Sequence, residues 1–219
     1  MPRLARFLPP DNVFHIMCRG NNGNDIFHSP LDYLKYLELL DRFKVEHPFD
    51  LFHYCLMTNH IHLVARVHES NGFSMFMKKL NLGYFKHYQK EYGWAGHFWQ
   101  DRFKSKLITQ DIYLIQCGKY IELNPVRAKL VSSPEEYLWS SYNYYANGGS
   151  NSRLCRDIFY DTLGANDSSR QVAYAKIIVE EVFGFSNKAV AQGERKEVYN
   201  ANRRFDYHQE HKDSPYRKS

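Results

Sequence analysis

Residues 60–67 carry an apolar side chain at every second position, and this period of two constrains the fold more than any other part of the chain. The apolar residues of the segment share one face of the expected strand: Ile61, Leu63, Ala65 and Val67. That face has to cover a hydrophobic core built with helices. The side chains of His60 and His62 therefore point from the opposite face of the sheet, away from those helices.

The first helix has clear start and stop signals. Ser29 is typical of a helix N-cap and Pro30 of the first helical position. Pro48 disfavours helix at the residue before it. We therefore expect a helix from Pro30 to about His47.

Hydrophobic periodicity predicts the remaining elements. Strands are expected at residues 13–19, 50–58 and 98–109, and helices at residues 73–92 and from Thr109 or Asp111 to near Asn124. The resulting order is β-α-β-β-α-β followed by a helix. This order predicts an α+β, ferredoxin-like fold, with one antiparallel sheet and two helices on one face.

The chain is expected to divide after residue 146. Residues 147–152 form a linker of Gly, Asn and Ser, which separates a domain at 1–146 from an extension at 147–219. Further helices are expected at residues 134–145 and 172–183, and a polar, mobile tail from Gly193.

Composition excludes several classes of protein. No apolar run reaches about 18 residues, so no membrane span is expected. The N-terminus lacks the apolar stretch of a secretory signal. The four cysteines form no CxxC pair, which argues against a zinc ribbon or a disulfide framework. These features favour a cytoplasmic protein.

The stretch from Lys78 to Lys106 is basic and aromatic. It holds seven Lys or Arg residues against two acids, together with eight aromatic residues. Cations neutralise phosphates and aromatic rings stack on bases, so this stretch fits a surface for single-stranded nucleic acid. A solvated helix face with ordinary core aromatics explains the pattern equally well.

His60 and His62 are two residues apart on one strand face, so both imidazoles can reach a single cation. The third helix adds Gln116, Tyr120 and Asn124, which share a face at spacings of four residues. An amide oxygen of Asn124 can complete a divalent site, and such a donor set suits Mg²⁺ or Mn²⁺ better than a closed zinc site. A tyrosine one turn away can attack a phosphorus that the metal polarises.

These motifs resemble those of a known family. His60-Ile61-His62 is similar to the His-hydrophobe-His motif of HUH endonucleases, and residues 120–128 resemble the tyrosine helix of single-tyrosine transposases. Blocks at residues 17–22 and 98–104 are similar to further family blocks. The chain is identified as resembling the REP-associated tyrosine transposases, over roughly residues 10–146.

The resemblance implies a metal-dependent enzyme that nicks and joins single-stranded DNA at REP-type hairpins. His60, His62 and Asn124 would hold Mg²⁺ or Mn²⁺, and Tyr120 would attack the scissile phosphate. The products would be a 5′-phosphotyrosine linkage and a free 3′-hydroxyl. The protein would act in the bacterial cytoplasm, associated with the nucleoid, as a monomer or a homodimer.

Charge and placement, rather than a strict motif, suggest which residues contact DNA. The candidates are Arg19, Asn21, Lys79, Lys86, Arg102, Lys104, Lys106 and Arg127. A salt bridge at the helix end is an equally good reading for Arg127.

Two other classes of function remain open. A non-catalytic hairpin-binding protein would keep the fold and the basic surface, although binding alone needs neither the histidine pair nor Tyr120. A ferredoxin-like RNA-binding module would carry exposed aromatic residues on its central strands, where this chain has histidines. The Tyr-x-x-x-Asn-Pro segment argues against a replication initiator or a plasmid relaxase.

The other histidines give weaker signals. His15 shares the non-core face with Arg19 and is expected to be a surface histidine, with a place near the site as the alternative. Four further histidines have no second residue at the spacing that metal ligands need: His53, His68, His87 and His97. Glu122 is out of phase with Tyr120 on the helix, which argues against a role as general base.

Overall fold

A computed structural model describes residues 7–109 and 111–178, with the backbone alone for residues 111–113. The chain divides between residues 175 and 176, and the fold below is that of the first unit. The helix expected at residues 172–183 is helical at 167–178, as far as it is described. Its remainder and the expected tail from Gly193 lie outside the described residues.

One antiparallel sheet forms the centre of this unit. Its strands are β1 (Asn12–Arg19), β2 (Asp50–Met57), β3 (His60–Val67) and β4 (Lys104–Ile108). They lie side by side in the order β2-β3-β1-β4, and every neighbouring pair is antiparallel. This topology confirms the predicted ferredoxin-like fold.

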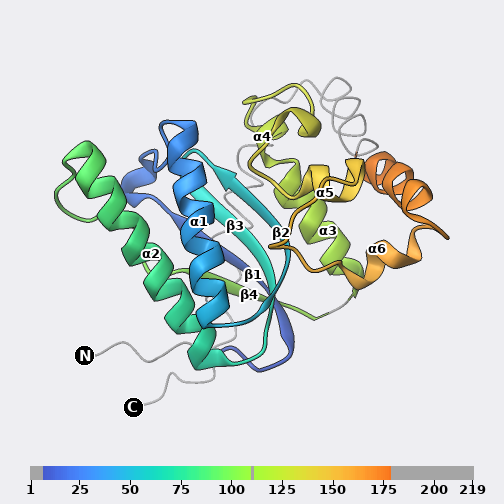
Figure 1. Cartoon of the computed structure of the whole chain (residues 1–219), viewed down its shortest axis with the longest axis horizontal. Coiled ribbons are helices and arrows are strands. Elements are labelled where there is room, and N and C mark those ends of the chain that lie inside the picture. Colours follow the sequence, from blue (N-terminus) through green and yellow to red (C-terminus); the bar gives the residue numbers. More distant parts are fainter. Residues whose placement is uncertain (1–6, 110, 179–219) are drawn as a thin grey trace, which may run out of the picture. The chain divides into compact units, whose positions relative to one another are not determined.

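Two helices, α1 (Pro30–Glu46) and α2 (Ser70–Tyr92), lie side by side over one face of the sheet (Figure 1). Their apolar sides and the alternate strand residues, Ile61 and Leu63 among them, form the main hydrophobic core. Ser29 is the N-cap as predicted, and it forms a capping box with Asp32 at the start of α1. Helix α2 begins at Ser70, three residues earlier than expected.

The opposite face of the sheet is partly covered by helix α3 (Asp111–Glu122). Leu114 and Ile121 of this helix pack with Phe52 of β2 and Val64 of β3 in a second hydrophobic cluster. Strand β3 is therefore buried on both faces at Val64. The short helix α4 (Asn124–Arg127) follows α3, because Pro125 has no N–H with which to continue the helix.

The strand predicted at residues 98–109 is wrong in its first half. Only Lys104–Ile108 forms β4, and of the residues before it Trp99 makes a single bridge to Gly20. Phe98 and Phe103 are buried in the core of α1 and α2, and the Trp99 Nε1–H donates to the Asn81 carbonyl at 3.0 Å. Packing of these large rings bends the segment away from the sheet.

The helix predicted at residues 134–145 is also wrong. Pro134–Glu136 forms a 3₁₀ turn (η2) and Tyr142–Asn147 forms α5. Between them the chain runs beside β2, where the Leu56 N–H donates to the Trp139 carbonyl at 2.9 Å. Pairing with the strand edge satisfies backbone groups that would otherwise be exposed, and this gain outweighs the local helical pattern.

Two further short elements complete the description. Asn21–Gly23 forms a 3₁₀ turn (η1) after β1, and Ile158–Thr162 forms α6 beyond the expected linker. Before α6, the Cys155 N–H donates to the Leu51 carbonyl of β2 at 2.8 Å. Residues from beyond position 146 therefore also cover the edge of β2. Within residues 7–109 and 111–178, no helix is long and apolar enough to cross a membrane.

Gly118 sets how closely α3 approaches the sheet. A Cβ at this position would lie 2.8 Å from ring atoms of His53 in β2, closer than packed atoms come. We expect Gly118→Ala to destabilise the fold by about 1–3 kcal/mol, the usual cost of overpacking, despite the higher helix propensity of alanine. Chemical denaturation measures the change.

Gly72→Ala in α2 is the matched control. Its Cβ would meet only the end of the flexible Glu69 side chain, at 3.1 Å. We expect it to leave the free energy of unfolding unchanged or slightly higher. Equal effects of the two substitutions would contradict the close approach of α3 to His53.

Candidate active site

His60 and His62 point from β3 toward the face of the sheet that α3 partly covers. His62 is buried, with 3% of its surface exposed, and His60 is partly exposed. In the pairing of β1 with β3, Arg19 lies opposite His60 and Met17 lies opposite His62. The two imidazole rings are edge to face, with centroids 4.8 Å apart. The strand alternation therefore brings the predicted pair together as expected.

Asn59, in the turn before β3, orients the ring of His60. Its Nδ2 donates to the Gly23 carbonyl at 3.1 Å, which leaves its Oδ1 facing His60 Nδ1 at 2.6 Å. An amide oxygen can only accept, so His60 Nδ1 carries the proton. The lone pair of His60 Nε2 is then available to a ligand. From the sequence alone, Asn59 is only the link between the strands expected at residues 50–58 and 60–67.

His15 of β1 lies against His62, and the prediction that it is a surface histidine is wrong. The two rings are stacked with centroids 5.0 Å apart, and His15 Nε2 is 2.8 Å from His62 Nδ1. One proton must lie between these two nitrogens. If His62 Nδ1 carries it, His62 Nε2 is free to bind a cation, which is how a second histidine orients a metal ligand.

All three imidazoles have lowered pKa values. Burial, with the charge of Lys106, lowers the pKa of His15 to about 4. Burial, with the charge of Arg19, lowers the pKa of His60 to about 4, and burial lowers that of His62 well below its usual value. The rings are therefore neutral at pH 7 and offer lone pairs, the form that metal ligation requires.

Tyr120 lies in the last turn of α3, edge-on to these histidines. Its ring centroid is 6.1 Å from that of His62 and 6.4 Å from that of His15. The side chain is 37% exposed, so a substrate can reach it. The Arg127 guanidinium lies 5.2 Å from the ring centroid of Tyr120 and donates to the Tyr120 carbonyl at 3.2 Å. Arg127 therefore binds both the ring and the helix end that carries it.

Asn124 follows Tyr120 by one turn, where Pro125 interrupts the helix. Among the described residues, its Nδ2 is a buried polar atom without a hydrogen-bond partner. The Nδ2 atom can only donate a hydrogen bond, so it suits an acceptor such as a phosphate oxygen, and a cation would need the Oδ1 atom of the same amide. The described residues contain no group of three or more His, Cys, Asp or Glu suited to a metal. Two imidazoles and an amide oxygen therefore stay a predicted donor set.

The predicted DNA-binding residues lie in two places. Lys106 and Lys104 of β4 lie opposite His15 and Met17 of β1, on the histidine face, and Arg19 ends β1 beside His60. Asn21 lies in η1, directly after Arg19. The three cations form a polar rim on the face of the sheet that carries the histidines.

The other basic residues predicted to contact DNA are not part of this rim. Lys79 and Lys86 belong to α2, across the sheet from the histidines, and Lys79 pairs with Glu46 at 2.6 Å. Arg102 precedes β4 and is exposed. Arg127 contacts Tyr120, as described above. The structure thus brings together some of the predicted residues and leaves those of α2 apart.

A buried charged cluster holds α3 against β2. Glu122 and His53 are 0% and 1% exposed, and His53 Nδ1 lies 3.0 Å from Glu122 Oε1. On the other side of the ring, His53 Nε2 lies 3.3 Å from Asp157 Oδ2. Burial lowers the pKa of His53, but the hydrogen bonds and charges of Asp157 and Glu122 outweigh it and raise the pKa to about 9. His53 has no partner at ligand spacing in the sequence, because its partners are 69 and 104 residues away.

The fold is similar to that of a solved tyrosine transposase. The most informative solved structure is a REP-associated tyrosine transposase bound to a REP hairpin, with a TM-score of 0.57 and 18% identity over 72% of this chain and 93% of that chain. A putative transposase from Deinococcus radiodurans has a TM-score of 0.39 and 13% identity over 55% of this chain and 96% of that one.

Residues 11–124, just over half of the chain, match the family described as "Transposase IS200 like". The chain belongs to this transposase family. Both predicted motifs, the histidine pair and the tyrosine with its asparagine, lie within the matched residues. No curated protein sequence matches the chain closely enough to count as a relative.

The raised pKa of His53 predicts that stability depends on pH. The ring faces Glu122 of α3 and Asp157 before α6, and it stacks on Tyr145 of α5. A pKa raised from 6.5 to about 9 means that the protonated ring stabilises the folded state fully below about pH 6.5. This stabilisation, on the order of 3 kcal/mol, is lost as the pH rises through 9.

Chemical denaturation between pH 6.5 and 9 measures this dependence. His15, His60 and His62 have lowered pKa values and stay neutral in this range. The His53→Gln variant serves as the control, and its stability is expected to vary less with pH. Parallel pH profiles for the two proteins would show that His53 is not held protonated.

Proposed function

We propose that this transposase cuts and rejoins single-stranded DNA at hairpins, with Tyr120 as the nucleophile. The observation that carries the proposal is the position of Tyr120, exposed to solvent and edge-on to the neutral imidazoles of His62 and His15. A phenol is a weak nucleophile at its ordinary pKa of about 10, so it needs a neighbouring Lewis acid to attack a phosphodiester.

His60, His62 and Asn124 are the residues that would hold a divalent cation, Mg²⁺ or Mn²⁺. The supporting observations are the free Nε2 of His60 and the proton shared by His62 and His15, and Asn124 is assigned by its place one turn after Tyr120. When bound, the cation would polarise the scissile phosphate and leave coordination positions for its oxygens. Asn59 and His15 act by orienting the two imidazoles.

The chemistry proposed for Tyr120 is a reversible exchange of phosphodiesters. The phenol oxygen forms a bond to phosphorus and its proton passes to water, while the bond from phosphorus to the 3′-oxygen breaks. The 3′-oxygen takes up a proton and becomes a free hydroxyl, and the 5′ end stays linked to Tyr120. Because the phosphodiester energy is kept in this linkage, a 3′-hydroxyl can reverse the step without ATP.

A DNA hairpin is the proposed substrate. Arg19, Lys104 and Lys106 lie on the histidine face, where they can neutralise phosphates that lead toward Tyr120. The fold relative was solved with a REP hairpin bound, which supports the same substrate class here. The alternative is a protein that binds hairpins without cutting them, and such a protein would not need the fixed tautomer of His60 or the neutral ring of His62.

The first test is formation of a covalent adduct. A labelled single-stranded DNA with a REP-type hairpin is incubated with Mn²⁺ or Mg²⁺ and analysed on a denaturing gel. The wild-type protein is expected to give a metal-dependent band that Tyr120→Phe loses by at least about 10³-fold, as for loss of a nucleophile. Tyr113→Phe, also in α3, is the matched control and keeps the band.

Binding without metal-dependent cutting would favour the non-catalytic alternative. A band that persists in Tyr120→Phe would assign the nucleophile to another residue. Absence of hairpin binding would contradict the proposed substrate class.

The role proposed for His15 has a readout that does not depend on catalysis. Loss of a residue that orients a metal-binding histidine typically weakens metal binding by about 10- to 100-fold. We expect His15→Ala to weaken Mn²⁺ binding by this factor in calorimetry. His68→Ala is the control, since His68 is exposed and pairs with Asp50. Equal Mn²⁺ affinities of wild type and His15→Ala would exclude the orienting role.

A further inference from the structure

The Glu122 cluster lies on α3 on the side away from Tyr120. Successive helical residues turn by 100°, so Glu122 and Tyr120 point in directions about 200° apart and differ by about 3 Å along the axis. We define the Glu122 cluster as Glu122, the three side chains that hydrogen-bond its carboxylate, and Asp157, which hydrogen-bonds His53. The three side chains are His53, Ser141 and Tyr174. None of these residues takes part in the chemistry proposed above.

Every polar contact of the Glu122 carboxylate comes from a different part of the chain. His53 of β2 and the Ser141 hydroxyl both donate to Oε1, and the Tyr174 hydroxyl donates to Oε2 at 2.7 Å. Glu122, His53 and Ser141 are almost completely buried, and Tyr174 is 4% exposed. In such surroundings each hydrogen bond is strong and its geometry is restrictive. The carboxylate therefore fixes both the position of the last turn of α3 along the helix axis and its rotation about that axis.

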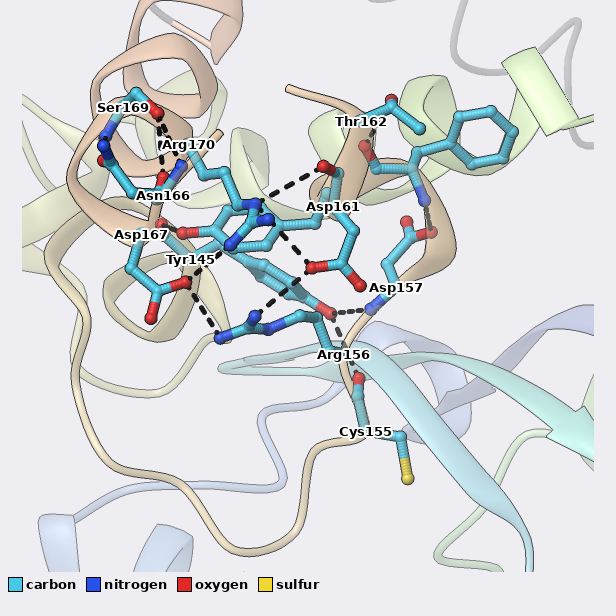
Figure 2. A network of polar contacts seen from close by, with 12 residues as sticks. Tyr145, Cys155, Arg156, Asp157, Asp161, Thr162, Asn166, Asp167, Ser169 and Arg170 are labelled. Atoms are coloured by element: carbon cyan, nitrogen blue, oxygen red, sulfur yellow. Dashed lines mark hydrogen bonds and ion pairs between the residues drawn. The ribbon is translucent and has the colours of Figure 1, made fainter. Parts of the chain in front are cut away.

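Asp157 and Tyr174 come from beyond residue 146, and the first of them is itself firmly held. Figure 2 shows the Asp157 N–H directed at the Tyr145 hydroxyl, at 3.3 Å, and the Asp157 carboxylate accepting the Phe159 N–H at 2.9 Å. Tyr145 also stacks on the His53 ring with centroids 4.6 Å apart. The carboxylate that faces His53 is thus positioned by its own backbone and by α6.

Ion pairs connect the neighbouring residues of this segment. Arg156 pairs with Asp161 and with Asp167, each at 3.2 Å, and Arg170 pairs with Asp167 at 3.0 Å (Figure 2). These pairs link the residue before Asp157 to the helix that carries Tyr174. The segment from Leu154 to Tyr174 is therefore held together as one unit, and it supports α3 on the side away from Tyr120.

We propose that Glu122 is a positioning residue for Tyr120, and that residues 154–174 belong to the working active site because they complete the Glu122 cluster. The inference rests on the proposed role of Tyr120. Without the cluster, α3 keeps its apolar contacts through Leu114 and Ile121, which restrain its rotation far less than directional hydrogen bonds do. A misplacement of about 1 Å at a reacting group costs about 100-fold in rate.

The test compares Glu122→Gln and Tyr174→Phe with Asp32→Asn. Asp32 is the matched control, because it is a buried carboxylate with several hydrogen bonds, but it caps α1 on the other face of the sheet. Single-turnover adduct formation is measured at saturating hairpin DNA and at a temperature where all proteins are folded. Hydrogen exchange of the α3 amides and the hairpin Kd are measured alongside.

We expect Glu122→Gln to slow adduct formation by about 10- to 100-fold, to speed exchange in α3 and to leave the hairpin Kd within twofold. Tyr174→Phe should act in the same direction with a smaller effect. Asp32→Asn should lower thermal stability without changing the adduct rate. An unchanged rate for Glu122→Gln, or an equal loss for Asp32→Asn, would overturn the inference.

The two proposals fail in different ways. If wild type forms no adduct, the proposed function of Tyr120 is wrong, and the exchange measurement still decides whether Glu122 holds α3. If wild type forms the adduct and the α3 amides exchange equally in wild type and Glu122→Gln, the positioning role alone is wrong.

Discussion

Strand β3 is confined between two layers, and the rest of the molecule depends on how its two faces differ. One face is uniformly aliphatic and covered by α1 and α2. The other carries His60 and His62 at one end and Val64 beneath α3. Burial of the aliphatic face supplies the stabilisation, at roughly 25 cal/mol per Å² of apolar surface. The same burial holds the histidines on a rigid support with little freedom to move.

The polar groups on the far face of the sheet fall into two classes with opposite electrostatics. His15, His60 and His62 are neutral because burial and nearby cations lower their pKa values. His53 is charged because two carboxylates outweigh its burial. Both classes lie under or beside one helix, α3. The neutral rings can accept a cation, whereas the charged ring is already paired and serves to hold the helix.

Much of the fold and part of the site followed from local patterns. The alternation in β3 placed His60 and His62 on the correct face, and the caps of α1 marked its start at Pro30. The contacts that complete the site could not be predicted, because they join residues distant in sequence. His15 reaches His62 across 47 positions and His53 reaches Asp157 across 104. The mistaken helix at 134–145 has a similar cause, since pairing with the edge of β2 overrides local propensity.

The tight turn at Asn59 has a consequence for how the molecule folds. Since side chains on a strand alternate with a period of two, a slip of β3 by one residue against β1 would place both imidazoles among the core leucines and expose four aliphatic side chains. Such a misfolded molecule would be strongly disfavoured. Correct placement of the histidines is therefore a condition of folding itself, and molecules that reach the compact state have their histidine-bearing face already assembled.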